Sequence, residues 1–373
     1  MGKPPVVIIG AGIIGLAHAI TAREHGHDVV VLERDGRALG ASVRNFGTLW
    51  PIGCASGAER EQALFGVRRW AQLATDAGFW FSPQGSLSLA YRDEAWAVLQ
   101  EFTSSVGDCE LLDASAVHHR FPAARPDGLQ GAVYSPAEAV VHPPSTLAAL
   151  ADYARSLGIV LHFGTPVVKV HDEAVETSDG RCIAFDRLVI AAGEEMRLLF
   201  PEALAAAGVQ RCRLQMMRTV PQPAGFALGA VFVSDLTLCH YPAFATCPST
   251  PRLRARLAGE LPDHADWGIH VIAAQHDDHT LTLGDSHEYG LDFDPDSHSG
   301  VEQLILDALD EFVTVPDLRV ASRWHGVYLK STRGETQVVL HPRARVTMVT
   351  AMGGLGMTLS WGLAARTVES WRS

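Results

Sequence analysis

The chain has 373 residues, of which 47% are hydrophobic, and it carries a formal net charge of −12 at pH 7. This length and apolar content are enough for a large core and, by the usual size of domains, indicate about two domains. An acidic balance of this size provides no basic surface for phosphate backbones, so a nucleic-acid partner is not expected.

The first predicted element is a nucleotide-binding turn. An apolar strand runs into Gly10-x-Gly12-x-x-Gly15, a helix follows, and a second strand, VVVLER, ends with Glu33. Gly10 permits the tight turn, Gly12 lets the backbone approach a pyrophosphate, and Gly15 lets the helix pack on the strand. The helix N-terminus offers amide groups and positive dipole to a phosphate, and Glu33 would accept from a ribose hydroxyl. The order of strand, helix and acid favours a dinucleotide site over a merely structural glycine turn.

The middle of the chain alternates between two types of element. Residues 58–78 have apolar positions at helical spacing, and residues 80–92 alternate like a strand that leaves the nucleotide domain. Residues 144–157 predict a helix that opens with Pro, Ser and Thr and precedes the return of the chain to that domain. An Asp-Gly pair at 179–180 indicates a hairpin, and LVIAAG, ending at Gly193, is typical of a buried parallel strand.

Two elements are predicted near the end. Residues 269–287 form a hairpin with its turn at 276–279. The last segment places a strand before the sequence GGLG at 353–356 and a helix after it, so a second helix N-terminus is directed at a ligand.

These pieces together resemble the superfamily of FAD-dependent amine oxidoreductases that contains glycine oxidase, D-amino-acid oxidase and sarcosine oxidase. The resemblance rests on the glycine fingerprint with its acid, the LVIAAG strand and the C-terminal GGLGMTLSWG stretch, which occur in the right order. It implies an α/β fold with two domains. A Rossmann-type FAD-binding domain would take residues 1–82, 140–211 and 324–373, and a discontinuous α+β substrate domain residues 83–139 and 212–323.

The resemblance also implies a cofactor site for FAD. Segment 40–51, GASVRNFGTLWP, lies where the family places its pyrophosphate and flavin contacts, and the C-terminal stretch would cradle the flavin through backbone amides. Sarcosine oxidases tether their flavin through a cysteine, but Gly326 stands at the aligned position, so the FAD should be noncovalent. For Arg44 a solvated surface charge is the alternative. The cofactor-binding candidates are Gly10, Gly12, Ile14, Gly15, Glu33, Arg34, Ser42, Arg44, Asn45, Val168, Ala192, Gly193, Gly354, Leu355, Gly356, Met357 and Thr358.

Four stretches, ASVRNFGTLWP, SPAEAVVHP, CRLQMMRT and GDSHEYG, resemble a bacterial subgroup associated with the oxidation of aminophosphonates related to 2-aminoethylphosphonate. Amino-acid oxidases usually carry W-x-G-L-R-P-x-T, whose arginine grips the substrate carboxylate. The aligned residues 324–331 read WHGVYLKS here, so Tyr328 stands at the arginine position. A phenol cannot give the charged, bidentate grip of a guanidinium, which puts an ordinary α-amino acid in doubt.

A substrate anion would need other cations, and a tetrahedral phosphonate suits several single donors, with lysine acting as a point charge. For Lys330 a solvated lysine is the alternative, and for His287 and His142 a histidine bonded to backbone. The substrate-binding candidates are Arg213, Arg218, His287, Tyr289, His325, Tyr328 and Lys330.

The cofactor implies the chemistry. A C–H beside a neutral amine passes hydride to flavin N5, and the imine hydrolyses to an aldehyde plus an amine. No side-chain base is named, because binding can itself favour loss of the amine proton. O2 would reoxidise the flavin and give H2O2, unless an electron-transfer partner does so. Two alternatives stay open, oxidation of an amino acid or hydroxy acid and a flavoprotein without catalysis, whereas an NAD-only enzyme would leave the C-terminal motif unexplained.

Several features are not expected. Residues 276–279 (HDDH) and His287 carry metal-ligand side chains, but the first four occupy a predicted turn where polar residues are usual, so no metal is predicted. Six cysteines without a C-x-x-C pair indicate no disulfide framework. The N-terminal apolar stretch is the fingerprint strand, interrupted by glycines and His18, so neither a secretory signal nor a membrane contact is expected. A cytoplasmic protein is the simplest prediction.

Overall fold

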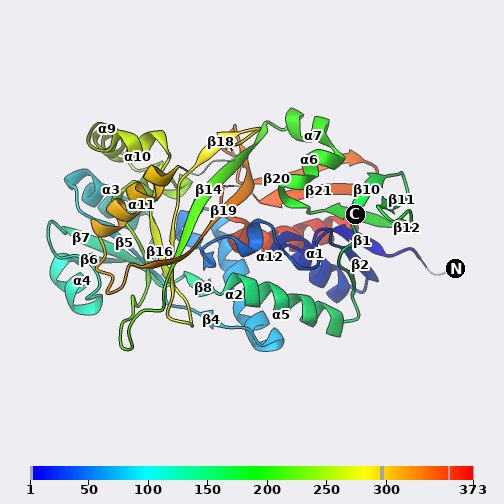
Figure 1. Ribbon diagram of the computed structural model, residues 1–373, viewed down its shortest axis with the longest axis horizontal. Coiled ribbons are helices and arrows are strands. Elements are labelled where there is room, and N and C mark those ends of the chain that lie inside the picture. The colour runs from blue at the N-terminus through cyan, green and yellow to red at the C-terminus, as the bar shows by residue number, and fades with distance from the viewer. Residues whose placement is uncertain (1–2, 295–297, 352, 373) are drawn as a thin grey trace.

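The computed structural model describes residues 3–294, 298–351 and 353–372. The chain folds around two large sheets that lie side by side, with both termini on the half that holds the first sheet (Figure 1). Within the described residues, no helix is both long and apolar enough to cross a membrane.

The first sheet has six strands in the order β20-β21-β13-β1-β2-β9, and all are parallel except β20. Its strands are β1 (Val6–Ile9), β2 (Val29–Leu32), β9 (Val160–His162), β13 (Arg187–Ile190), β20 (Gln337–Arg343) and β21 (Val346–Ala351). One face is covered by the helices α1 (Ile13–Glu24), α2 (Ala58–Ala77), α5 (Pro143–Ser156) and α12 (Gly356–Glu369).

The other face of this sheet packs against a small antiparallel sheet of β10 (Val167–Val170), β11 (Ala174–Thr177) and β12 (Cys182–Ala184), and against α6 (Met196–Leu199) and α7 (Pro201–Ala206). Alternate residues of β1 therefore join different cores: Val6 and Ile8 contact the helices, while Val7 and Ile9 contact the opposite layer. Burial on both faces explains why β1 is apolar at every position.

The second sheet has nine strands, β18-β14-β17-β16-β15-β5-β7-β6 with β19 on the other edge of β14. They are β5 (Ser86–Ala90), β6 (Glu110–Asp113), β7 (Gly131–Ser135), β14 (Val209–Thr219), β15 (Val231–Val233), β16 (Ile272–Gln275), β17 (Leu281–Gly284), β18 (Glu288–Gly290) and β19 (Val320–Ser331). Around it lie α3 (Asp93–Ser105), α4 (Ala114–Arg120), α8 (Asp235–Leu238), α9 (Thr250–Glu260), α10 (Pro262–Asp266) and α11 (Ser299–Asp310).

Strands β14 and β19 pair along almost their whole length and connect the two halves (Figure 1). Leu329 of β19 belongs to the core of the first sheet, whereas Met217 of β14 belongs to the far core of the second. Met216, on the opposite face of β14, packs in one cluster with Trp50 and Leu355. Even-numbered side chains of β14 therefore face segment 40–51 and the glycine-rich turn before α12.

A third small sheet of β3 (Thr48–Leu49), β8 (Ala139–Val141) and β4 (Phe81–Ser82) lies where the halves meet. The prediction of one continuous strand over residues 80–92 is wrong, because this segment forms two strands, β4 and β5, in different sheets. Gly85 separates them with φ +72°, and a Cβ there would lie 2.5 Å from the carbonyl oxygen of Ser135. The turn is possible because glycine has no side chain.

The other predicted elements are confirmed. The predicted helices correspond to α2 and α5, the Asp-Gly pair turns between β11 and β12, residues 276–279 turn between β16 and β17, and β21 leads into α12. The predicted domain limits at residues 212 and 324 fall inside β14 and β19, and the limits themselves stay a prediction.

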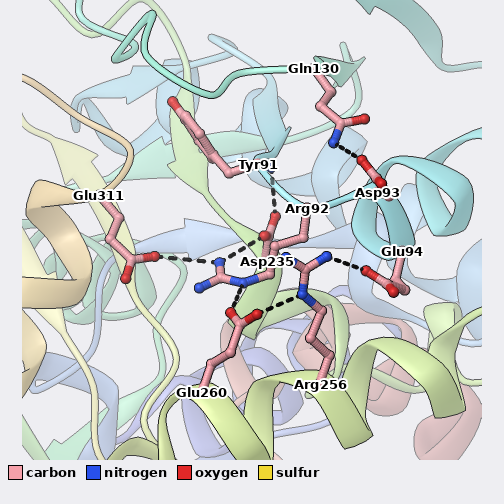
Figure 2. Close-up of polar contacts among 9 residues, drawn as sticks. All are labelled: Tyr91, Arg92, Asp93, Glu94, Gln130, Asp235, Arg256, Glu260 and Glu311. Carbon is pink, nitrogen blue, oxygen red and sulfur yellow. Dashed lines mark hydrogen bonds and ion pairs between the residues drawn. The ribbon is translucent and has the colours of Figure 1, made fainter.

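An ion-pair network with one buried pair at its centre links the segment after β5 to the surrounding helices (Figure 2). Arg92 donates to Asp235 at 3.0 Å and to Glu260 at 2.8 Å, and it approaches Glu311 at 3.4 Å. Arg256 joins the same Glu260 at 2.7 Å. Because the side chains of Arg92 and Asp235 are only 13% and 2% exposed, this network anchors the second half of the molecule.

Candidate functional site

The glycine fingerprint forms the turn between β1 and α1, and two of its glycines are required by close backbone contacts. A Cβ at Gly15 would lie 1.9 Å from the carbonyl oxygen of Gly10, and a Cβ at Gly10 would lie 2.5 Å from that of Ala191. Gly10 also has φ +104°, which other residues rarely adopt. No side chain can therefore stand between this turn and the end of β13.

The N-terminus of α1 is joined to the segment 40–51. Ile13 N donates to Ser42 Oγ at 2.9 Å, and a Cβ at Gly12 would lie 3.0 Å from that oxygen. Ser42 thus stands at the helix end where a pyrophosphate is expected, with Ile14 in the first helical turn.

The carboxylate of Glu33 is fixed beside the same turn. Its Oε2 accepts from Ala11 N at 2.8 Å and its Oε1 from Asp35 N at 3.0 Å. A carboxylate has about four acceptor positions, so two such bonds leave capacity for a ribose hydroxyl. Arg34 is directed elsewhere, because its guanidinium pairs with Glu195 at 3.0 Å.

The remaining candidates of the first half lie at strand ends. Ala192 and Gly193 follow β13, and Gly193 has φ +58°. Val168 is 55% exposed, at the point where the register between β10 and β11 shifts. Such a bulge leaves the ladder locally disrupted, and backbone groups there are suited to a ligand.

The C-terminal glycines form an open cradle at the start of α12. Gly353 and Gly354 have φ +67° and +78°, and apart from the neighbouring backbone no heavy atom of the described residues lies within 4 Å of where a Cβ would stand at Gly354 or Gly356. Leu355 is buried beneath the turn. The first helical turn is therefore open to a ligand, as a flat ring system bound through backbone amides requires.

Two buried aromatic residues hold this helix start in place. Thr358 Oγ1 accepts from Trp50 N at 2.8 Å, and the carbonyl oxygen of Met357 accepts from Trp70 Nε1 at 2.9 Å. The segment 40–51 is thus bound to α1 through Ser42 and to α12 through Trp50. The glycine turn, this segment and the open cradle together fit an extended dinucleotide that carries a flat ring.

The same segment also contacts β19. Trp324 Nε1 donates to the carbonyl oxygen of Arg44 at 3.1 Å, and Arg44 Nη1 donates to that of His325 at 3.2 Å. Asn45 instead shapes its own turn, donating to the carbonyl oxygen of Ala41 at 2.9 Å and accepting from Gly47 N at 2.7 Å.

Four of the predicted substrate residues gather on the face of the second sheet that looks toward this cradle. Cys212 of β14 stands opposite Tyr289 of β18 on one side and opposite Tyr328 of β19 on the other. Lys330, two residues further on the same face, has its Nζ 5.9 Å from the centroid of the Tyr289 ring. The rings of His287 and Tyr289 are 6.2 Å apart.

The other three predicted substrate residues do not join this group. His325 has the opposite side-chain parity in β19 and lies beside Arg213, which is paired with Glu288 at 2.6 Å. Arg218 lies six residues along β14 from Cys212, a displacement of about 20 Å. It stands over the Trp324 ring at 5.4 Å and approaches His142 at 3.4 Å.

Sequence reasoning missed the residues that surround His287. His240, which follows α8, and His270, which precedes β16, have ring centroids 3.9 Å apart, and the centroids of His240 and His287 are 4.5 Å apart. Asp285 lies beside them, fully buried. No local spacing connects these positions, because distant segments bring them together.

The chain also links this group to the cofactor cradle. The Tyr241 ring lies 5.7 Å from that of His270 and 6.0 Å from that of Trp50. Gly53 lies between the rings of Trp50 and Tyr241, where only a glycine fits, because a Cβ there would lie 2.4 Å from the Trp50 ring and 2.7 Å from the Tyr241 ring. A cavity of about 250 Å³, lined by α8, α9 and α10, opens on the other side of His240 and His270.

Burial sets the charge of this group. It lowers the pKa of His287 to about 3 and holds the pKa values of His240 and His270 well below the usual 6.5, with further lowering by neighbouring charges. Burial also lowers the pKa of Lys330 and raises that of Asp285 well above its usual value. The histidines are therefore neutral near pH 7, and a bound anion would favour the charged form of Lys330.

Comparison with known proteins identifies the family. The profile of the FAD dependent oxidoreductase family matches residues 5–370. The fold is similar to that of glycine oxidase from Geobacillus kaustophilus, with a TM-score of 0.79, 21% identity and coverage of 99% of this chain and 95% of the other. L-proline dehydrogenase from P. horikoshii follows with a TM-score of 0.77, 19% identity and coverage of 98% and 92%.

The curated relatives are longer proteins. The tRNA 5-methylaminomethyl-2-thiouridine biosynthesis bifunctional protein MnmC of Pseudomonas entomophila is 30% identical over 241 residues, which are 63% of this chain and 36% of the relative. Across the curated relatives that it matches, the chain spans between 20% and 53% of their length.

These findings confirm the predicted fold class and the resemblance to the superfamily that contains glycine oxidase. They also confirm the predicted cofactor, for which the glycine turn and the open cradle provide a fitting site. The chain belongs to the FAD dependent oxidoreductase family, and it is an oxidoreductase that uses FAD.

Proposed function

We propose that the protein oxidises a small amine that carries an anionic group, and that the amine is an aminophosphonate related to 2-aminoethylphosphonate. The observation that carries this proposal is the wall formed by Tyr289, Tyr328 and Lys330 on the sheet face beside the cofactor cradle. Amino-acid oxidases that resemble this chain carry an arginine at the position of Tyr328. The names of the structural neighbours, glycine oxidase and L-proline dehydrogenase, support oxidation at an amine.

The wall suits a phosphonate better than a carboxylate. A carboxylate is gripped best by the planar fork of a guanidinium, which Tyr328 cannot supply. A phosphonate has three oxygens in a tetrahedral arrangement and can accept separate bonds from an ammonium and from phenol hydroxyls. Lys330 provides the charge, and its partial burial strengthens the attraction by excluding water.

The residues of the chain orient the substrate and limit access of water, while the redox chemistry comes from the cofactor. When bound, FAD would supply an acceptor for the hydride of the C–H beside the amine and a route for its electrons to O2, which gives H2O2. The imine then hydrolyses to an aldehyde and an amine. We infer a noncovalent flavin, held by the backbone of the glycine turn and the cradle. We assign no catalytic base.

The proposal is tested by mixing the flavin-loaded protein, without oxygen, with a panel of amines and following the visible absorbance of the flavin. The panel contains 2-aminoethylphosphonate, its N-methyl and 1-hydroxy derivatives, glycine, sarcosine, D-alanine and a 2-hydroxy acid. Bleaching by phosphonates alone supports the proposal. Bleaching by glycine, sarcosine or D-alanine means that another residue grips a carboxylate, and no bleaching by any amine contradicts the proposed activity.

Admission of air then separates the two acceptor classes. Rapid recovery of the flavin spectrum with one H2O2 per turnover identifies an oxidase. Slow recovery, accelerated by an artificial electron acceptor, identifies a dehydrogenase and removes O2 from the proposal.

A further inference from the structure

Three histidines converge at one point from three separate segments of the chain. One ring nitrogen from each of His240, His270 and His287 lies within 4.8 Å of the other two. His270 and His287 are 3% and 5% exposed, and His240 is partly exposed. Such a grouping of imidazoles is unusual, because each buried polar ring must find a partner.

Two buried polar atoms in this cluster have no hydrogen-bond partner among the described residues, Asp285 Oδ1 and His270 Nδ1. Asp285 Oδ1 lies 3.2 Å from His270 Nε2 and 3.7 Å from His287 Nδ1, but the directions do not make a hydrogen bond. Buried groups of this kind point to a ligand that satisfies them.

The hydrogen bonding of His287 leaves one of its ring nitrogens free to bind an ion. His287 Nδ1 lies 3.0 Å from the carbonyl oxygen of Gly268, to which it donates, so that Nε2 keeps its lone pair for another atom. Metal-binding histidines commonly donate their second nitrogen to a backbone carbonyl in this way.

We propose that His240, His270 and His287 form a site for a divalent transition-metal ion of the zinc class, with Asp285 beside the rings of His270 and His287 as an outer partner. Imidazole is a preferred ligand of zinc, and three protein ligands leave the fourth position for water or another small ligand. The ion would tie together the segments after α8, before β16 and between β17 and β18. The inference does not depend on which amine the enzyme oxidises.

The site must contract when the ion binds. Zinc lies about 2.0 Å from histidine nitrogen, so tetrahedral ligands are about 3.3 Å apart. The three ring nitrogens are now up to 4.8 Å apart, which is larger than this distance. Rotation of the partly exposed His240 side chain is the simplest way to bring them closer. An anion is the alternative occupant, and the metal titration below distinguishes the two.

The test uses the flavin-loaded protein. Bound metal is measured by elemental analysis as purified, then removed with a chelator, and the protein is titrated with Co²⁺ and Zn²⁺. The expected result is one equivalent per chain, a Co²⁺ visible spectrum typical of four ligands that Zn²⁺ abolishes, and a higher Tm with Zn²⁺. His270→Gln, His287→Gln and Asp285→Asn should lose at least tenfold in affinity.

His264→Gln is the matched control, since His264 is also a buried histidine and lines the cavity next to His240 and His270, but its Nε2 lies 3.1 Å from the carbonyl oxygen of Leu304 and it is not one of the three grouped histidines. This variant should bind the metal normally. Flavin content and circular dichroism identify any variant that has not folded, and the Co²⁺ spectrum of the unmodified protein decides the proposal independently of variants.

Two outcomes would overturn it: no stoichiometric binding of Co²⁺ or Zn²⁺, or equal binding by His270→Gln. Neither result bears on the substrate panel, so failure of the metal site and failure of the proposed activity are separate.

Discussion

Glu138 should make the stability of the protein depend on pH in an unusual direction. Its carboxyl group is fully buried, with Oε1 accepting from Ile52 N at 2.8 Å and Oε2 accepting from Ser86 Oγ at 2.9 Å. Burial raises its pKa from 4.5 to about 7. The charge of Arg60 opposes this rise only weakly, and its guanidinium is paired with Asp108 at 2.8 Å.

The sign follows from proton binding. Between pH 4.5 and 7 the folded state binds more protons at this group than the unfolded state does, so the free energy of unfolding falls as pH rises. A shift of about 2.5 pKa units corresponds to about 3 kcal/mol, all of which is lost by pH 8. Glu138→Gln keeps the shape and cannot ionise, so its stability should lie within about 1 kcal/mol of the unmodified protein at pH 5 and exceed it by about 3 kcal/mol at pH 8.

The assay is urea unfolding of both proteins, followed by circular dichroism, at half-unit intervals from pH 5 to 8 and constant ionic strength. Glu202→Gln, at an exposed glutamate in α7, is the control and should leave the curve unchanged. Parallel stability curves for the unmodified protein and Glu138→Gln would refute the reasoning, since they would mean that the carboxyl group does not gain a proton on folding.

Three further predictions concern other parts of the molecule. Gly15→Ala places a Cβ 1.9 Å from a backbone oxygen and should abolish flavin retention, measured by absorbance after gel filtration, whereas Gly36→Ala, with no heavy atom within 4 Å, should retain it. Lys330→Met should raise KM for the phosphonate roughly 10- to 100-fold, because one charged hydrogen bond to the substrate is lost, while the flavin content stays unchanged. An unchanged KM would contradict the proposed anion contact. Arg92→Met leaves a buried carboxylate unpaired and should cost about 3–5 kcal/mol in urea unfolding, against about 1 kcal/mol or less for the more exposed Arg256→Met; equal losses would refute a special role of the buried pair.

The cofactor half could be predicted from the sequence because its signals are local. Gly10, Gly12 and Gly15 stand within six positions, and the C-terminal glycines directly precede a helix, so spacing alone identifies the turns. The divided strand at Gly85 shows the limit of this reasoning, because alternation of side chains does not reveal that a chain passes from one sheet to another.

The substrate side was harder for a different reason. In β19 the alternation of a strand separates His325 from Tyr328 and Lys330, and recognising this segment as one continuous strand would have removed His325 from the group. No such rule could have found His240 and His270, because they meet His287 only through the order of strands in the second sheet.

The paired strands β14 and β19 restrict how the enzyme can open. They run between the two halves, pair along 11 residues of β14 with one shift of register between Arg218 and Thr219, and carry side chains of both cores. Bending this ribbon would break many backbone hydrogen bonds at once, so the halves cannot swing apart as hinged bodies do. Substrate and product must instead pass through small displacements of side chains and short loops, and turnover should be insensitive to solvent viscosity changes that slow large domain motions.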